Sequence, residues 1–159
     1  MMRNGDQKKG TQIVRLEFTS TFDMLDLVQV VSDHVALVVG LDEDAQHWVG
    51  VAIRESVINA IKHGNGHDAG KHVAVEFATA VAAGVAELTI CVRDEGAGFD
   101  PSRLANPLAE ENLLKASGRG IFLIRNFMDD VQLGRARGGG MEIRMTKRVQ
   151  VTGAGGRLS

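Results

Sequence analysis

The beginning of the chain shows two different spacings of apolar side chains. Over residues 12–19 apolar and polar side chains alternate, which is the period of a strand with one buried face. Between residues 21 and 39 the apolar side chains recur every three or four positions, which is the period of an amphipathic helix. Ser20 or Thr21 is placed to cap this helix, and Gly40 is placed to end it. The pattern therefore predicts a strand followed by a helix.

A second helix is predicted from about residue 42 to residue 63. Asp42 and Asp44 lie at its start, where acidic side chains interact favourably with the positive end of the helix dipole. Gly64 ends the helix, and the Asn-Gly pair at 65–66 is a turn signal. We therefore expect the chain to reverse direction directly after this helix.

The rest of the chain predicts four strands and one further helix. Its strand segments are rich in valine, isoleucine and phenylalanine, which favour strands. The predicted ranges are strands at 71–79, 85–93, 131–133 and 141–147, and a helix at 121–128. An irregular stretch between residues 100 and 117 holds both prolines and separates the second of these strands from the helix.

This order of elements predicts an α+β protein with two layers. Neighbouring strands joined by short links favour antiparallel pairing, and three helices are enough to cover one face of a sheet. We therefore expect a two-layer α/β sandwich whose sheet is mixed and mostly antiparallel. One domain is expected over residues 12–150, preceded by a disordered arm at 1–11 and followed by a flexible tail at 151–159.

The composition excludes several classes of function. Cys91 is the only cysteine, so an intramolecular disulfide and a cysteine-rich zinc site are excluded, and we expect it to be a small buried side chain in a cytoplasmic protein. The formal net charge of −2 gives no electrostatic reason to bind nucleic acid or an anionic membrane. No apolar run approaches the ~20 residues of a membrane span, and we expect no signal peptide.

Glu55 and Asn59 form the first segment with candidate chemistry. They are four residues apart in the second predicted helix, so they project from the same side of it. An amide oxygen is a suitable ligand for Mg²⁺, and a carboxylate can accept a proton or position a water molecule. Taken alone, the pair also fits an ordinary solvated helix face.

Asp94 opens the second segment, directly after a predicted strand. Gly96 and Gly98 follow it, and glycine permits both close approach of the backbone to a ligand and positive φ angles. The Asp94 carboxylate is able to accept a hydrogen bond from the exocyclic amine of a base. Taken alone, this segment also fits a loop that merely tolerates glycine.

Gly118, Arg119 and Gly120 form the third segment, at the start of the last predicted helix. Backbone N–H groups at a helix N-terminus bind anions such as phosphate, and the helix dipole adds to this attraction. Ser117 acting as an ordinary helix cap is the alternative interpretation. The segment does not match the dinucleotide fingerprint, because no G-x-G-x-x-G follows a strand here.

The three segments in this order resemble the histidine-kinase-like (GHKL) ATPase superfamily. The resemblance covers residues 13–147. The segments that carry it are 55–64, 92–99, 117–121 and 125–129. Within the superfamily, the chain is most similar to the anti-sigma factor serine/threonine protein kinases. The resemblance implies a Bergerat-type ATP-binding fold.

The resemblance also implies roles for single residues. Glu55 becomes the general base for the serine or threonine hydroxyl of a protein substrate. Asn59 becomes a ligand of the Mg²⁺ that bridges the phosphates of ATP. Asp94 becomes the acceptor for the adenine amino group, with Gly96 and Gly98 shaping its pocket.

The phosphates of ATP are expected to lie against the third segment. There the resemblance implies that Gly118 and Gly120 present backbone amides, beneath a lid formed by residues 100–117. Lys115 and Arg119 are two further candidate phosphate contacts, because cationic side chains form strong hydrogen bonds to phosphate. For each of them a side chain that points to solvent is the open alternative.

The function implied by the resemblance is that of an ATP-dependent serine/threonine protein kinase that regulates transcription. Such a protein inhibits a sigma factor, phosphorylates a small anti-anti-sigma protein of the STAS type, and works as a homodimer in the cytoplasm. The alternative is a module of the same fold in which ATP controls partner binding without phosphoryl transfer. Glu55 favours the kinase, because a pure binding module needs no base at that position.

Overall fold

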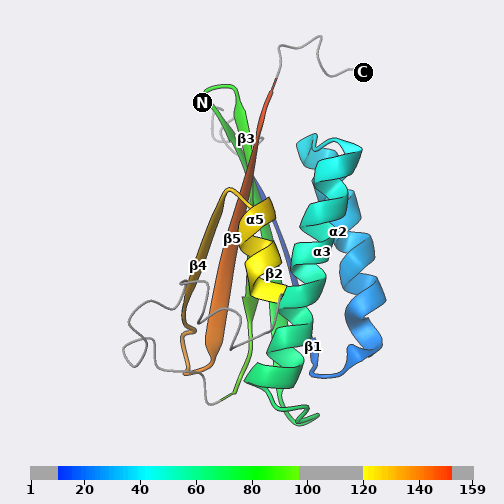
Figure 1. The fold of residues 1–159 in the computed structure, drawn as a ribbon, viewed down its shortest axis with the longest axis vertical. Helices are drawn as coiled ribbons and strands as arrows, with labels where there is room; N and C mark the ends of the chain where they lie inside the picture. Colours follow the sequence, from blue (N-terminus) through cyan, green and yellow to red (C-terminus); the bar gives the residue numbers. More distant parts are fainter. Residues whose placement is uncertain (1–10, 97–119, 152–159) are drawn as a thin grey trace, which may run out of the picture.

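The computed structural model describes residues 11–96 and 120–151. Within these residues, five strands form one sheet in the order β1-β2-β3-β5-β4, and each pairing between neighbours is antiparallel (Figure 1). The strands are β1 (Gln12–Thr19), β2 (His72–Ala82), β3 (Val85–Arg93), β4 (Asp130–Arg135) and β5 (Met141–Gln150). Strand β5, the last of the described strands, therefore lies inside the sheet, with its start beside the end of β3.

The helices form the second layer of the molecule. They are the 3₁₀ turn η1 (Phe22–Met24), α2 (Leu25–Val39), α3 (Glu43–Asn59), the π-helical turn η2 (Ala60–Gly64) and α5 (Gly120–Phe127). Helix α3 packs against both α2 and α5 (Figure 1). This arrangement confirms the predicted two-layer α+β sandwich, but the expectation of a mixed sheet is wrong for the described strands, because all of their pairings are antiparallel. Within residues 11–96 and 120–151, no helix combines the length and the apolar character needed to cross a membrane.

The hydrophobic core lies between the sheet and the helices. Val75 and Phe77 of β2 and Ile90 of β3 are buried, while their neighbours on β2 are partly exposed. Ile53 and Val57 of α3 belong to the same buried cluster. Because burial of one such side chain contributes about 1.5–3 kcal/mol, this contact between the layers is the main support for the position of α3.

The opposite face of the sheet carries charged side chains in pairs. The pairs are Arg15–Glu76, Arg93–Glu142, Arg148–Glu87 and Arg144–Glu142. Exposed ion pairs contribute about 0–1 kcal/mol each, so these pairs keep the face polar and add little to the stability of the fold.

Cys91 is buried, as the sequence predicted. Only 1% of its surface is exposed. Burial raises the pKa of its thiol, because the charged thiolate loses its hydration there. Cys91 is therefore a small packed side chain in β3.

The structure confirms the predicted helix boundaries at Asp42 and Gly40 but not the predicted cap at Ser20 or Thr21. Asp42 caps α3, and its Oδ1 accepts a hydrogen bond from the Ala45 N–H at 2.8 Å. Gly40 ends α2 with a φ of 101°, which glycine adopts without a steric penalty. The predicted hydroxyl cap at the start of α2 is wrong. The chain enters through the 3₁₀ turn η1 instead, and Thr21 makes no side-chain capping hydrogen bond.

The end of the second helical segment differs from an ordinary helix end. Its last turn widens into η2, where the Asn65 N–H donates to the Ala60 carbonyl at 2.7 Å. Turns of the π type are rare and occur often at functional positions. Here the wider turn places Gly64 and Asn65 against the residues that follow β3.

Candidate functional site

Asp94 lies at the end of β3 and is 7% exposed. Its Oδ1 accepts hydrogen bonds from the backbone N–H groups of Gly96 and Met141, both at 3.0 Å. Its own N–H donates to the Met141 carbonyl, also at 3.0 Å. In the part of the chain that the structure describes, Oδ2 receives no hydrogen bond. The two bonds to Oδ1 therefore fix the direction of the Asp94 carboxylate, and among the described residues Oδ2 stays available as an acceptor.

Three glycines surround Asp94 so closely that none has room for a side chain. A Cβ at Gly64 would lie 2.0 Å from the Asp94 Oδ2, and a Cβ at Gly140 would lie 1.8 Å from the Asp94 carbonyl oxygen. A Cβ at Gly96 would lie 1.7 Å from the Gly64 carbonyl oxygen. Gly96, a glycine that the sequence assigned to the site, lies beside Asp94 and donates its N–H to the Asp94 Oδ1.

Gly64 and Gly140 were missed as site residues. The sequence presented Gly64 as a helix stop and Gly140 as part of a turn between two strands. A glycine required by a turn and a glycine required by the close approach of another backbone look the same in a sequence, so the second role could not be recognised. Only the pairing of β5 with β3 brings Gly140 under Asp94.

Asn65 is the third residue that the sequence did not identify. It is 3% exposed. Its Nδ2 donates to the Ser20 Oγ at 3.1 Å and to the His72 carbonyl at 2.9 Å. Its Oδ1 accepts from the Glu95 N–H at 2.8 Å. The side chain thus joins the turn η2 to the residue that follows Asp94.

Glu55 and Asn59 lie on α3, one helical turn apart. Both side chains are partly exposed. The Nδ2 atom of Asn59 is buried and has no hydrogen-bond partner within the described residues. An unpaired buried amide is costly, and an acceptor atom on a bound molecule would satisfy it. Among the described residues, the Glu55 carboxylate has no hydrogen-bond partner and no ion-pair partner.

These residues fit a magnesium–nucleotide complex by the chemistry of their donor groups. Mg²⁺ prefers oxygen ligands and usually takes only one or two from the protein, with the remainder from water and phosphate. The described residues contain no group of three or more His, Cys, Asp or Glu side chains able to hold a metal by themselves. Asn59 with an amide oxygen, beside the carboxylate of Glu55, is consistent with such sparse coordination.

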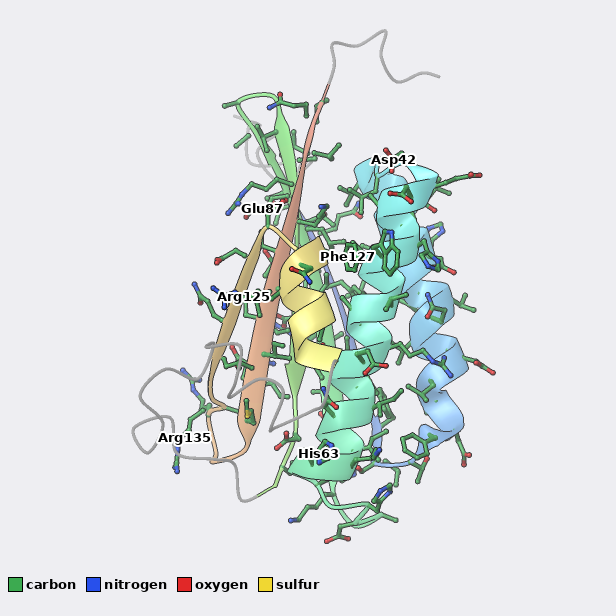
Figure 2. All side chains as sticks on the ribbon, in the orientation of Figure 1. Asp42, His63, Glu87, Arg125, Phe127 and Arg135 are labelled. Atoms are coloured by element: carbon green, nitrogen blue, oxygen red, sulfur yellow. The ribbon has the colours of Figure 1, made fainter. Side chains whose placement is uncertain are left out.

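Helix α5 runs alongside α3 in the opposite direction (Figure 1). Near the start of α3, Trp48 stacks on Phe127 with ring centroids 3.9 Å apart and an interplanar angle of 8°. Figure 2 shows Phe127 between the two helices and His63 of η2 beyond the other end of α3. Because α5 ends at Phe127 and runs opposite to α3, the start of α5 lies toward the later half of α3, the half that contains Glu55 and Asn59.

The end of α5 is held by a cation. The Lys147 Nζ donates to the Phe127 carbonyl at 3.1 Å, and it lies 3.8 Å from the Asp129 carboxylate. A positive side chain at the C-terminus of a helix is favourable for the helix dipole. Lys147 and the Trp48 stack therefore fix the direction in which the N-terminus of α5 points.

The structure places only part of the predicted site. Asp94 and Gly96 are in contact, Glu55 and Asn59 share one side of α3, and Gly120 begins α5. The remaining predicted contacts lie outside the described residues: Gly98, Lys115, Gly118 and Arg119. By their chemistry, Asp94 could accept a hydrogen bond from a nucleotide base, Asn59 could bind a metal ion held by phosphates, and Glu55 could accept a proton.

Two comparisons with known proteins agree with the resemblance drawn from the motifs. The family model described as the histidine kinase-like ATPase domain matches residues 18–147. The serine-protein kinases RsbW of Bacillus cereus (strain AH820) and of Bacillus anthracis are 26% identical to this chain over 145 residues. The alignment covers 86% of this chain and 85% of each relative. RsbW of Bacillus thuringiensis (strain Al Hakam) has the same identity and coverage.

Proposed function

The chain belongs to the histidine kinase-like ATPase domain family, and on that premise we propose that it is an ATP-dependent serine/threonine protein kinase. The observation that supports this most strongly is the hydrogen bonding of the Asp94 carboxylate. Its Oδ1 is used by two backbone N–H groups, while Oδ2 stays available beside Gly64. A buried, fixed carboxylate oxygen of this kind suits the exocyclic amino group of adenine.

The other half of the proposed site handles the phosphates and the acceptor hydroxyl. Asn59 would hold Mg²⁺, which neutralises phosphate charge when it is bound with ATP. The backbone N–H groups at the start of α5 would face the phosphates, because a helix N-terminus attracts anions. Glu55, one turn from Asn59, would lie within reach of the incoming hydroxyl.

In the proposed reaction Glu55 acts as the general base. The oxygen of the substrate hydroxyl forms a bond to the γ-phosphorus while the bond from that phosphorus to the β,γ-bridging oxygen breaks. ADP leaves, and the proton of the hydroxyl passes to the Glu55 carboxylate. Phosphoryl transfer depends mainly on positioning and charge, so a small set of well-placed groups is sufficient.

We propose a STAS-type anti-anti-sigma protein as the phosphate acceptor and a sigma factor as the protein that the chain inhibits, in the cytoplasm. Support comes from the motif resemblance and from relatives named serine-protein kinases. The test is transfer of labelled γ-phosphate from Mg-ATP to a STAS-type protein whose gene lies next to the gene for this chain. Label on that protein is the expected result. Binding of Mg-ATP without label on any such protein would favour the nucleotide-gated binding module instead.

Asp94→Asn is expected to weaken ATP binding while the fold is kept. The amide keeps an oxygen for the N–H groups of Gly96 and Met141, but it puts an NH₂ donor in place of the second oxygen. Two donors then face each other where adenine binds, so we expect the Kd for Mg-ATP to rise about 10- to 100-fold. Isothermal titration calorimetry measures this change. Asp26→Asn, at an exposed carboxylate in α2, is the control, and an equal Kd in both variants would contradict the assignment.

We propose that the chain forms a homodimer through the outer side of α2. Exposed apolar side chains recur there at helical spacing: Leu27, Val30, Leu37 and Val38. Single exposed apolar side chains are common on protein surfaces, but a row of them along one helix is typical of an interaction site. A second copy of the chain would cover this row.

Val30→Asp is expected to convert the dimer to a monomer, because it places a charge in the middle of the proposed interface. Val30 is 64% exposed, so the substitution leaves the core untouched. Val81→Asp is the matched control, since Val81 is 53% exposed and lies at the far end of β2. Sedimentation velocity of the two variants and the wild-type protein measures the masses. A wild-type monomer, or a Val30→Asp dimer, would refute this interface.

A further inference from the structure

The Asn65 side chain uses all of its hydrogen-bonding groups. Both Nδ2 protons are donated, one to the Ser20 Oγ and one to the His72 carbonyl, and Oδ1 accepts from the Glu95 N–H. The reverse orientation of the amide would set an NH₂ against the N–H of Glu95 and an oxygen against the His72 carbonyl. The orientation of the amide is therefore determined by its partners.

These bonds link four separate segments of the chain. Ser20 follows β1, His72 begins β2, Glu95 follows β3, and Asn65 itself closes the turn η2 through its N–H. Asn65 and Glu95 are 30 residues apart in the sequence. A single buried side chain thus fixes the position of the residue next to Asp94.

Asp94 is held by contacts with two separate segments, the turn at Asn65 and the start of β5. The peptide that joins it to Glu95 donates its N–H to Asn65, and the carbonyl of the same peptide packs over the Cα of Gly140. Next to Gly140, the Met141 carbonyl accepts from the Asp94 N–H, and the Met141 N–H donates to the Asp94 Oδ1. Without the bond from Asn65, the N–H of the peptide between 94 and 95 loses its partner. The peptide is then held by its β5 contacts and, through the Glu95 side chain, by His72, so it can rotate more than in the wild-type protein.

The side chain of Glu95 strengthens the same contact. Its Oε1 accepts from the His72 backbone N–H at 2.7 Å and lies 3.1 Å from the His72 Nδ1. The two hydrogen bonds lower the pKa of the Glu95 carboxyl. His72 therefore binds Asn65 through its carbonyl and Glu95 through its N–H, which closes a ring of hydrogen bonds around the end of β3.

We propose that Asn65 is a positioning residue that sets the direction of the Asp94 carboxylate and so determines the preference for an adenine over a guanine nucleotide. The proposal rests on the proposed ATP-binding function. A carboxylate oxygen in one fixed direction accepts a hydrogen bond from the amino group of adenine. In guanine the same position carries a carbonyl oxygen, which is also an acceptor, so no hydrogen bond forms. A carboxylate that is free to turn can instead accept from the N–H groups of guanine, so the discrimination falls.

The test compares Asn65→Ala with Ser20→Ala. Ser20→Ala removes one partner of Asn65 but keeps the bond to Glu95, so it serves as the control for a loss of packing and stability. The Kd values for Mg-ATP and for Mg-GTP are measured by calorimetry, with competition for the weaker nucleotide. Urea unfolding of each variant is measured in the same buffer.

We expect Asn65→Ala to reduce the ratio of the GTP Kd to the ATP Kd about tenfold, and Ser20→Ala to leave it unchanged. A purely structural role would lower the unfolding midpoint of both variants without changing this ratio. Asn65→Ser is the second variant, because its hydroxyl keeps a polar group in the pocket but is too short to reach the Glu95 N–H. Trimethylamine N-oxide is added to hold a weakened variant in the folded state.

The outcomes separate this inference from the proposed function. If the wild-type protein binds no Mg-ATP, the proposed function fails and the inference fails with it. If the wild-type protein prefers Mg-ATP and a folded Asn65→Ala or Asn65→Ser variant keeps that preference, the inference alone is overturned. A reduced preference in these variants, with Ser20→Ala equal to the wild-type protein, supports it.

Discussion

Glu55→Gln is expected to lower phosphoryl transfer about 10²- to 10⁴-fold, the usual contribution of a general base, without a loss of ATP binding. Glutamine has the same shape and can still form a hydrogen bond to the hydroxyl, but its neutral amide does not accept the proton. Glutamine is also a good helix former, so α3 keeps its geometry. The loss should therefore appear in the rate of transfer and not in the Kd for Mg-ATP.

Glu43→Gln is the matched control for this change. Glu43 begins α3 at an exposed position, so its substitution removes the same charge from the same helix, far from the site. Single-turnover transfer of labelled phosphate gives the rates, and calorimetry gives the Kd for each variant. Equal rates for Glu55→Gln and Glu43→Gln would remove Glu55 from the role of base and favour a binding module.

Gly140→Ala is expected to raise the Kd for Mg-ATP about 100-fold or more, which corresponds to roughly 3 kcal/mol. The added Cβ would lie 1.8 Å from the Asp94 carbonyl oxygen and 3.0 Å from its Oδ1. A backbone oxygen cannot turn away as a long side chain does, so Asp94 and its carboxylate must move as a unit. Crowding of this kind also destabilises the fold, by about 1–3 kcal/mol.

Gly134→Ala separates the crowding from the general effect of replacing glycine in a strand. Gly134 lies in β4, and a Cβ there would meet no atom within 4 Å. Neither glycine has a positive φ, so alanine fits the backbone conformation at both positions. Calorimetry with Mg-ATP and urea unfolding are the measurements. A Gly140→Ala protein that binds Mg-ATP as tightly as Gly134→Ala does would show that Asp94 tolerates the displacement.

Much of the fold was predictable because its elements follow local periodicity. The predicted strands at 12–19 and 85–93 have the same limits in the structure, as β1 and β3. The last strand was predicted to end at 147 but continues to Gln150, because its final residues pair with the start of β3. The pairing of two distant strands does not change the spacing of apolar side chains in either strand. The predicted strand was therefore shorter than β5.

The candidate site was predictable where chemistry is carried by residue type. Glu55, Asn59, Asp94 and Gly96 stood out as a carboxylate, an amide and a glycine-flanked acid in a recognisable order. Gly64, Asn65 and Gly140 did not, because turns use the same residue types for local reasons alone. Their contribution depends on contacts with Asp94 and Glu95, which lie 30 or more residues away.

By itself, the sequence determined the order of the helices and strands, the family and the identity of the residues that carry the proposed chemistry. These depend on local spacing and on side-chain type, which are present in the chain before it folds. The tertiary structure decided the strand order, and with it the position of Met141 and Gly140 beside Asp94. It also decided which carboxylate oxygen is held by the backbone and which stays available. The direction of a hydrogen bond depends on atoms from several distant segments, and only folding brings those atoms together.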